Sequence, residues 1–573
     1  MNCQGVRIRR SQPYVSSTPD SPHSLYGLLG PHLKSRLGRF GLALAIGLAI
    51  AGLGAAQPLL TRAVIDQGLL ARNYTRLAEA CFAILALALV SFFLGAWHRR
   101  LYVKVSGEVL FELRERVYAH LLAVSPRQLQ QRTTGDLVSR LDGDIAEVQR
   151  FGTDAAAAAI SGALGLVGAY AVMALLSWRL TLLVTVFLPL QWLIRHLARP
   201  RIEQNARDVR AQAANVGSFL VETLGNARGV MGAAAEAFEQ RRLGNLHANY
   251  LQRVIHQQML GYFVGSAAAI TGHLLTIAVF LVGGWLTVHQ RMSLGTLIAF
   301  VTFLSRGAGS AGSILGLYTG LQRARVSLGR IEDLLKMRAV ATNANAMSLP
   351  ATGGAISFKH VWLKGRDSQP LLCDINVEIN SGAKIRLSGV SGAGKSTMAD
   401  LLRRFLDPDS GEIRIDGLRL DHIRLGDLRR RVVVVEQTPM LISGTLWENL
   451  TYGLDDVSTD EVMIAAQQSG ADQIAKASPL GYQVEVGERG VGLSSGQRQR
   501  IAIARLLVGD PLIVILDEAT NALDQPSRSE IEAVIDQCFA GRTRIVISHH
   551  DEASTFDARY RLDDGMLLSV GPS

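Results

Sequence analysis

The chain has 573 residues, of which 48% are hydrophobic and 19% are charged, and its formal net charge is +10 at pH 7. This length is too great for one small domain, and the positive charge alone would allow nucleic-acid binding. The first half contains long apolar runs, however, and Lys and Arg of membrane proteins collect on cytoplasmic loops. We therefore expect a membrane protein and no nucleic-acid partner. The four cysteines show no spacing typical of a metal site or a disulfide; they are Cys3, Cys81, Cys373 and Cys538.

The first 23 residues are polar and rich in Ser, Pro and Arg, and they lack the apolar core of a signal peptide. We expect a disordered cytoplasmic tail over residues 1–23. Residues 24–37 mix Leu and Tyr with Lys34 and Arg36, a composition that favours an interfacial helix leading into the membrane. The transmembrane domain is expected over residues 24–336.

Six stretches reach the length of about 20 mostly apolar residues that a membrane-spanning helix needs. They are residues 40–60, 77–97, 155–176, 180–197, 260–288 and 294–317. Six spans place both termini on one side, and basic residues around the first span mark that side as cytoplasmic. These basic residues are Arg7, Arg9, Arg10, Lys34, Arg36 and Arg39. The sequence thus predicts a multi-pass protein of the plasma or inner membrane, surrounded by the lipid bilayer.

Two long charged intervals, residues 99–154 and 198–259, separate spans two from three and four from five. Both have helical periodicity and few breakers, so the membrane helices are expected to continue far into the cytoplasm. Short transverse pieces are predicted near residues 125–134, where Pro126 and Gly135 break the pattern, and near residues 218–226, around Gly225. A separate small helical domain is the alternative, but neither interval has enough apolar residues for its own core.

Two ionisable residues lie inside predicted spans: His273 in the fifth and Arg306 in the sixth. An Arg at the bilayer centre costs about 2.5–3.5 kcal/mol on insertion scales. It should therefore face a partner or a water-filled cavity. Our hypothesis is that Arg306 lines a substrate cavity and favours an anionic group on the substrate. His273 is either a second cavity residue or a hydrogen-bonded histidine between helices.

A polar stretch over residues 337–353 predicts a linker, and a soluble domain is expected over residues 354–573. A strand-like run at 383–387 and a helix-like run at 397–405 enclose a sequence that fits G-x-x-x-x-G-K-[ST]. Its residues are Gly389, Val390, Ser391, Gly392, Ala393, Gly394, Lys395 and Ser396. Backbone N–H groups of such a loop wrap phosphates, the lysine reaches the terminal phosphates, and the hydroxyl can ligate Mg²⁺.

A second cluster of phosphate chemistry lies between residues 493 and 524. The sequence LSSGQ, residues 493–497, precedes a helix-prone run, and a helix N-terminus can bind an anion. The apolar run 512–516 predicts a buried strand that ends in Asp517 and Glu518. One of these carboxylates can hold a metal and the other can act as a base, although a capped strand end alone would look the same.

The phosphate loop, LSSGQ and the sequence VGERG at residues 486–490 together resemble the nucleotide-binding domain of ATP-binding cassette (ABC) transporters over residues 354–573. The front of the chain resembles the six-helix membrane domain of the exporters of that family, including GDLVSRL at 135–141. The resemblance implies an α-helical membrane domain with six spans, followed by an α/β P-loop NTPase domain with a helical subdomain. It also implies that the two transverse pieces are coupling helices.

The resemblance further implies roles for individual residues. ATP phosphates would contact the loop from Gly389 to Ser396 and also Thr397. Mg²⁺ would be held by Ser396, Gln437 and Asp517. Glu518 would be the general base, Gln437 would reach the attacking water, and His549 would contact the γ-phosphate, with His550 as its rival. A second chain would cover the nucleotide in trans with Ser494, Ser495, Gly496, Gln497 and Asp524.

The sequence departs from the family pattern at the base. Phe358 matches the phenylalanine of the first cassette strand, and the position of the adenine-stacking aromatic then falls on Gly365. Stacking is either lost or supplied by Trp362 or Arg366, so we expect GTP to compete well with ATP. Three further departures remove no catalytic group: Ser495 replaces Gly, Asn521 replaces Ser and His550 replaces Arg.

Together these features predict a half-size ATP-driven exporter that hydrolyses ATP and works by alternating access. The expected substrate is small and amphipathic: a lipid, a drug or a small peptide. One membrane domain and one cassette per chain imply a homodimer, with a heterodimer as the alternative. A rival function is an ATP-gated channel or regulatory membrane protein, but gating alone does not need the base Glu518. A soluble cassette protein of translation or DNA repair is excluded by the six spans.

Overall fold

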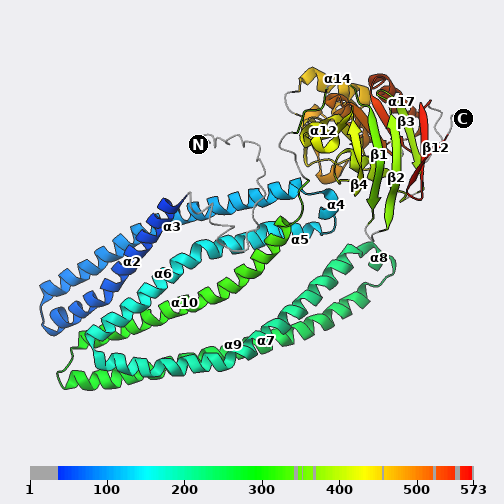
Figure 1. The fold of residues 1–573 in the computed structure, drawn as a ribbon. Coiled ribbons are helices and arrows are strands. Elements are labelled where there is room, and N and C mark those ends of the chain that lie inside the picture. Colours follow the sequence, from blue (N-terminus) through cyan, green and yellow to red (C-terminus); the bar gives the residue numbers. More distant parts are fainter. Residues whose placement is uncertain are drawn as a thin grey trace. The chain divides into compact units, whose positions relative to one another are not determined.

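The computed structural model describes residues 36–340, 346–350, 353–365, 369–390, 392–454, 457–519, 524–548 and 555–570. The chain divides into two compact units (Figure 1). The helical unit combines Pro22–Arg116 with Val138–Glu332, and the cassette unit is built from Asp333–Ser573 together with Val117–Leu137. The segment Val117–Leu137 thus belongs to the cassette unit although it lies between two membrane helices in the sequence. The predicted tail over residues 1–23 lies outside the described residues.

The helical unit consists of long helices joined by short turns. The long helices are α2 (Leu37–Ala63), α6 (Ile145–Leu176), α7 (Trp178–Gly225), α9 (Glu236–Val288) and α10 (Leu294–Leu335). Shorter segments are the π-helical η1 (Val64–Leu70) and η2 (Arg140–Asp144) and the helix α8 (Ala227–Gly232). Helix α3 (Tyr74–Ala123) starts in this unit. Helices α7 and α9 run side by side (Figure 1).

Among the described residues, five helices are long and apolar enough to cross a membrane. They are Leu37–Leu70, Tyr74–Ala123, Thr134–Leu176, Glu236–Val288 and Leu294–Leu335. The fourth predicted span corresponds to a shorter apolar stretch, Trp178–Leu190, at the start of α7. The predicted membrane domain with six spans is confirmed in its helical architecture, and the apolar stretch found for span four is the shortest of the set within the described residues.

Helix lengths explain the two charged intervals. Helix α3 has 50 residues and α9 has 53, which at 1.5 Å per residue is about 75–80 Å, more than twice a hydrocarbon core of about 30 Å. The continuation of membrane helices beyond the bilayer is therefore built into these single helices. The second transverse piece was predicted near residues 218–226, around Gly225. Helix α7 does end at Gly225, but the short helix α8 lies just after the predicted residues, at Ala227–Gly232.

Buried apolar side chains hold α6, α7, α9 and α10 together. Among them Leu180, Val279 and Phe300 are fully buried. Because helix surfaces elsewhere in this unit expose large apolar residues such as Phe82, Phe92 and Leu175, the unit suits an apolar solvent on its outside. This pattern is typical of a membrane domain.

The described part of the cassette unit contains a four-stranded and a six-stranded sheet. The first has the order β2-β1-β4-β5 and the second β12-β11-β3-β10-β9-β6. The strands are β1 (Ile356–Lys364), β2 (Pro370–Ile379), β3 (Lys384–Gly389), β4 (Ser410–Ile415), β5 (Leu418–Arg419), β6 (Val432–Val435), β9 (Ile513–Asp517), β10 (Thr543–Ile547), β11 (Ala558–Asp563) and β12 (Met566–Val570). Strands β11, β3, β10, β9 and β6 are parallel neighbours, as an α/β nucleotide-binding domain requires.

Helices complete the cassette unit (Figure 1). Helix α11 (Lys395–Leu402) packs its apolar face on the core between the two sheets. A second core joins α13 (Leu446–Leu450), α14 (Thr459–Ser469), α15 (Asp472–Lys476) and α16 (Ser495–Gly509). These four helices form the predicted helical subdomain. The remaining elements are α4 (Pro126–Leu129), α5 (Thr134–Ser139), η3 (Leu420–His422), α12 (Leu425–Arg431), β7 (Gly444–Thr445), η4 (Gly481–Gln483), β8 (Glu485–Val486), η5 (Glu488–Gly490) and α17 (Gln525–Cys538).

Candidate active site

The candidate site lies at the carboxyl ends of parallel strands in the six-stranded sheet. Strand β10 pairs with β3 on one side and β9 on the other, and Ile547 lies opposite both Leu387 and Asp517. The segments that follow β3 and β9 therefore begin at the same edge, where open α/β sheets bind ligands. The phosphate loop follows β3, and Glu518 follows β9. The fold thus brings together the two motifs that are separated by more than a hundred residues in the sequence.

The loop between β3 and α11 needs glycine at both of its ends. Gly389 has a φ of 149° and Gly394 a φ of 103°, values that residues with a Cβ rarely adopt. A Cβ at Gly389 would also overlap the carbonyl oxygen of Leu562. Gly394 is the N-cap of α11, so the loop ends in the free N–H groups of a helix N-terminus, which favour a phosphate.

Lys395 lies inside this loop. Its side chain is buried, and Nζ donates to the carbonyl oxygens of Gly389 at 2.8 Å and Val390 at 3.0 Å. The ammonium group is therefore held next to the backbone that would surround the phosphates. Gly392, Ala393 and Thr397 lie in the same loop and in the first turn of α11, whereas Ser391 lies outside the described residues.

Ser396 and Asp517 meet at the expected metal position. The Ser396 hydroxyl donates to Oδ2 of Asp517 at 2.7 Å, across 121 residues of sequence. A hydroxyl and a carboxylate are hard oxygen donors of the kind that Mg²⁺ prefers. The donor chemistry of this pair therefore fits Mg²⁺, as the sequence predicts.

Glu518 follows Asp517 in an unusual backbone conformation. Its φ is 51°, in the left-handed region that a glutamate rarely occupies, and its N–H donates to the Ile547 carbonyl at 3.0 Å. Such strained residues persist where the surrounding structure fixes them, and they gather at functional sites. The turn holds the two carboxylates at successive positions at the sheet edge.

Of the other predicted catalytic residues, the structure describes Gln437 but not the two histidines. Gln437 is exposed in the segment that follows β6, and β6 is the direct neighbour of β9, so Gln437 begins from the same edge as Glu518. His549 and His550 lie outside the described residues. They follow β10, the strand between β3 and β9, and the choice between them stays a prediction.

The LSSGQ sequence forms the N-terminus of α16. The side chain of Ser494 accepts from the Gln497 N–H at 3.2 Å, and the Gln497 side chain accepts from the Ser494 N–H at 2.9 Å. This capping box fixes the turn before the helix, and both Ser494 and Ser495 are exposed. Gly496 thus lies in the first turn, where its N–H is available to an anion outside the chain.

Asp524 similarly caps α17, where it accepts from the Ser527 N–H at 3.4 Å. The side chain and backbone of Ser527 hold the pKa of the Asp524 carboxyl below its usual value. Asp524 is therefore charged at neutral pH. Its predicted contact with a nucleotide in trans stays a prediction.

Gly365 lies close to the phosphate loop. A Cβ on Gly365 would lie 4.0 Å from the Leu371 Cβ, and one on Gly394 would lie 3.6 Å from the Leu371 Cγ. The predicted base-stacking position thus borders the same leucine as the loop. Trp362 points away from the core on β1, between the buried Val361 and Leu363, and is 44% exposed; Arg366 lies outside the described residues.

The first transverse piece contacts the cassette, as a coupling helix would, through partner residues that the sequence did not predict. The hydroxyl of Ser125, just before α4, donates to the Phe405 carbonyl, and Arg127 donates to the Lys364 carbonyl at 3.3 Å. The backbone bond from the Val340 N–H to the Ala123 carbonyl, at 2.9 Å, fixes the end of α3 beside them. No sequence signal identifies these partners, because 280 residues separate Ser125 from Phe405.

Arginines surround the same phenylalanine. The guanidinium groups of Arg403 and Arg429 lie 4.3 Å and 5.1 Å from the Phe405 ring centre, which is cation–π distance. Arg403 also pairs with Asp400 at 3.2 Å and with Glu436 at 3.5 Å, and Glu436 directly precedes Gln437. The contact point of α4 is thus linked by side chains to the segment that carries Gln437.

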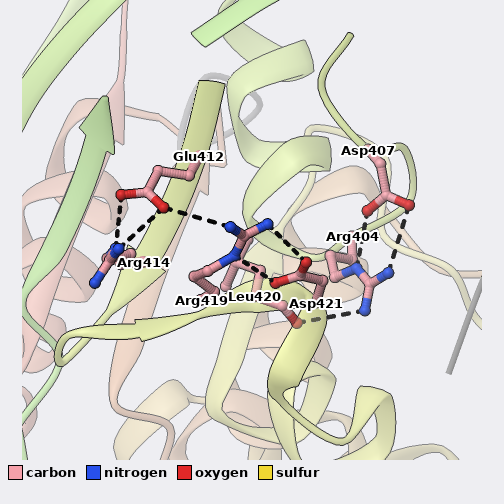
Figure 2. Close-up of polar contacts among 7 residues, drawn as sticks. All are labelled: Arg404, Asp407, Glu412, Arg414, Arg419, Leu420 and Asp421. Carbon is pink, nitrogen blue, oxygen red and sulfur yellow. Dashed lines mark hydrogen bonds and ion pairs between the residues drawn. The ribbon is translucent and has the colours of Figure 1, made fainter. Parts of the chain in front are cut away.

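A network of polar contacts includes Arg404, the residue that precedes Phe405 in the sequence (Figure 2). It consists of Arg404, Asp407, Glu412, Arg414, Arg419, Leu420 and Asp421. The buried Arg404 donates from Nε to Asp407 at 2.9 Å, and Arg419 pairs with Asp421 at 2.9 Å. Arg419 holds the pKa of the Asp421 carboxyl below its usual value. The network ties the end of α11 to β4, β5 and η3.

The two predicted cavity residues have different surroundings. Arg306, on α10, donates to the Gly54 carbonyl and, at 2.9 Å, to Oε1 of Gln57, both on α2. His273 lies exposed on α9. The structure therefore gives Arg306 protein partners. A contact of either residue with substrate stays a prediction.

Comparisons with known proteins agree with this fold. The family described as the ABC transporter transmembrane region matches residues 40–307, and the family described as ABC transporter matches residues 372–521. The chain therefore belongs to the ABC transporters, with the membrane region and the cassette fused in one chain. It is a half-size ABC exporter and a multi-pass membrane protein.

Individual relatives support the same conclusion. A multidrug resistance ABC transporter ATP-binding and permease protein of Lactococcus lactis is 32% identical over 82% of this chain and 80% of its own length. An ATP-dependent lipid A-core flippase of Legionella pneumophila is 30% identical over 78% of this chain and 76% of its own length. Among solved structures, that of a bacterial Atm1-family ABC exporter with ATP bound has a TM-score of 0.75 at 25% identity, and covers 93% of this chain and 94% of its own.

Proposed function

We propose that the protein hydrolyses ATP to drive the export of a small amphipathic substrate by alternating access. The observation that carries this proposal is the arrangement at the sheet edge: the Ser396–Asp517 pair lies at 2.7 Å, and Glu518 follows in a constrained turn. A metal-side pair next to a second carboxylate suits hydrolysis of the β–γ phosphoanhydride bond of ATP, and ATP binding alone would not need Glu518.

Each residue of the site has a distinct role in this proposal. The loop from Gly389 to Ser396 binds the phosphates through N–H groups, and Lys395 neutralises their charge. Ser396, Gln437 and Asp517 would hold Mg²⁺, which neutralises the β- and γ-phosphate oxygens when bound. Glu518 accepts the proton of the attacking water, a contribution of about 10²–10⁴-fold for a positioned base. His549 would contact the γ-phosphate.

The proposed assembly is a homodimer with two composite nucleotide sites. Ser494 lies exposed at the start of α16 and Gly496 lies in its first turn. A second chain would place its γ-phosphate there, and Asp524 would join them. Both halves of the composite site are present in this sequence, so one kind of chain is enough. In this proposal both termini lie in the cytoplasm, because the basic residues around the first span favour that side.

The domain boundaries of the proposal are a membrane domain over 24–336, a linker over 337–353 and a cassette over 354–573. In each cassette α4 would report the nucleotide state to the membrane helices, since Ser125 contacts Phe405 within the cassette unit. ATP binding then favours one orientation of the cavity, and hydrolysis restores the other.

Substrate class is open among lipids, drugs and small peptides. The flippase and the multidrug transporter among the relatives favour a lipid or an amphipathic drug. The test is uptake into inside-out membrane vesicles of a fluorescent anionic phospholipid, a cationic amphipathic dye and a short peptide. We expect ATP-dependent accumulation or flipping of one probe, and its loss in Glu518→Gln. If no probe moves although ATP is hydrolysed at a rate that depends on Glu518, the substrate lies outside these classes. Hydrolysis that no probe stimulates, with membrane conductance that depends on ATP, would instead favour the gated channel.

A further inference from the structure

A proline inside α2 leaves one backbone carbonyl without its helical donor. Pro58 lies within Leu37–Ala63 and is buried, and proline has no N–H to donate to the residue four positions earlier. That residue is Gly54. A carbonyl left unsatisfied at membrane depth is costly, because no water or lipid group replaces the lost hydrogen bond.

Arg306 of α10 supplies the missing donor. One N–H of its guanidinium goes to the Gly54 carbonyl, and another goes to Oε1 of Gln57 at 2.9 Å. A Cβ on Gly54 would lie 3.1 Å from Nη1 of Arg306, so glycine leaves room for this approach. The planar fork of arginine suits two acceptors one turn apart, whereas a lysine ammonium would reach them less well.

A second polar contact joins the end of span one to the start of span six. Asp66, in η1, accepts from the Gly295 N–H at 2.9 Å and from the Ser293 hydroxyl at 2.5 Å. Both donors belong to the start of α10, where a carboxylate is favoured by the helix dipole. A Cβ on Gly295 would lie 2.7 Å from the Asp66 carboxyl carbon, so glycine again permits the contact.

We infer that Arg306 and Asp66 form a two-point clamp that holds span one antiparallel against span six and stabilises the conformation of the membrane domain seen here. The two points are about 18 Å apart along span one at 1.5 Å per residue. Arg306 is in this account a positioning residue: it acts by satisfying the carbonyl that Pro58 exposes. This goes beyond the proposed export function, because it requires neither a particular substrate nor ATP hydrolysis.

A double-mutant cycle on the melting temperature tests the Arg306 point. The variants are Arg306→Met, Pro58→Ala and the two combined, in the full-length protein in lipid nanodiscs. Alanine restores an N–H at position 58, so the Gly54 carbonyl regains its helical partner. We expect Arg306→Met to lower the melting temperature by about 2–4 °C or more and to cost less than half of that in the Pro58→Ala background. Arg76→Met, an exposed arginine of α3 paired with Glu79, is the matched control and should show the same small effect in both backgrounds.

Spin labels give a readout that general destabilisation would not produce. Labels on cysteines at Leu69 and Leu294, which are 57% and 42% exposed, report the separation of the two segments in a background without the native cysteines. We expect the distribution of distances between the two labels to be broader in Arg306→Met and in Asp66→Asn than in the parent protein. Adding Pro58→Ala to Arg306→Met should restore the narrow distribution. Adding Pro58→Ala to Asp66→Asn should not restore it.

Equal cost of Arg306→Met in both backgrounds, or an unchanged label distribution, would overturn the clamp. The clamp would also be overturned if Arg306→Met lost only the transport of an anionic probe, while stability and label distances stayed unchanged. That result would favour the hypothesis that Arg306 lines the substrate cavity. Because neither readout uses ATP turnover, a failure of the clamp and a failure of the export proposal are distinguishable.

Discussion

The residue at position 365 decides what faces the base in the proposed ATP site. Gly365 borders Leu371 beside the phosphate loop and has no ring to stack on adenine. Stacking a base on an aromatic ring contributes about 1–3 kcal/mol. We therefore predict that Gly365→Tyr tightens ATP binding by about five-fold or more, whereas Gly365→Leu, which adds volume without a ring, has a smaller effect.

The measurement is competition of ATP and GTP with a fluorescent nucleotide. In the wild type we expect GTP to compete nearly as well as ATP. A strong preference of the wild type for ATP would show that Trp362, Arg366 or another group already recognises the base. No gain of affinity in Gly365→Tyr would show that position 365 does not face the base.

Asp400 is a carboxyl whose environment opposes its charge. It lies half-buried in α11, and burial raises the pKa of this carboxyl, with Glu436 and Asp517 adding to the effect against the opposing pull of Arg403. A group with a raised pKa contributes stability that is full below its ordinary pKa and is lost as pH rises through the folded pKa. Asp400→Asn removes this loss, so the melting temperature of the variant relative to the wild type should rise between pH 4.5 and pH 7.5.

Asp421 is the control for Asp400, because the pKa of its carboxyl is shifted in the opposite direction. Arg419 lowers the pKa of Asp421, so the stabilising contribution of Asp421 is present above its ordinary pKa and is lost as pH falls. Asp421→Asn should therefore cost stability at pH 7.5 and cost less at low pH. Scanning calorimetry of the full-length variants measures both. A cost of Asp400→Asn that is greater at pH 7.5 than at pH 4.5 would mean that its pair with Arg403 outweighs burial.

At the scale of elements, α4 lies in the cassette unit although it follows α3 directly in the sequence. Ser125 is 8% exposed, and its hydroxyl donates to the Phe405 carbonyl. Loss of such a bond costs about 1 kcal/mol and leaves the carbonyl unsatisfied. We predict that Ser125→Ala reduces the stimulation of ATP hydrolysis by substrate and leaves the basal rate nearly unchanged.

Ser139→Ala is the matched control for Ser125, because Ser139 is exposed at the end of α5. It should leave basal and stimulated rates unchanged. The hydrolysis rate with and without a transported probe, in lipid nanodiscs, distinguishes the two variants. Equal stimulation in the wild type and Ser125→Ala would remove α4 from the coupling pathway.

Sequence patterns predicted the elements well where one segment determines its own structure. Apolar length predicted the spans, and glycine spacing after a strand predicted the phosphate loop. Gly225 marked the break after α7 correctly, but the pattern placed the second short helix before this break, whereas α8 follows it at Ala227–Gly232. Contacts such as Ser125–Phe405 and Arg306–Gly54 depend on the fold and have no local pattern. Pro58 was nevertheless a readable signal, since a proline within a span always frees a carbonyl that needs a donor.

At the scale of the whole molecule, the composite sites predict complementation between two defective chains. Lys395→Ala damages the phosphate loop, and Gly496→Asp places a negative charge where the γ-phosphate of a second chain would lie. In a mixed dimer one site carries both defects and the other carries none. We predict that co-purified mixed dimers retain bound nucleotide and that either homodimer alone does not. If both motifs served the nucleotide of their own chain, every site in the mixture would be defective and the mixture would be as empty as the homodimers.

In the proposed function the protein uses ATP hydrolysis at Glu518 to move a substrate. The most direct test is the ATP hydrolysis rate of the purified protein in lipid, with Glu518→Gln beside it, while lipids, drugs and peptides are added in turn. We predict that one class of compound stimulates hydrolysis and that Glu518→Gln lowers the rate by about 10²-fold or more while ATP binding is retained. A basal rate that is indifferent to every compound and unchanged in Glu518→Gln would contradict the account and favour an ATP-gated function.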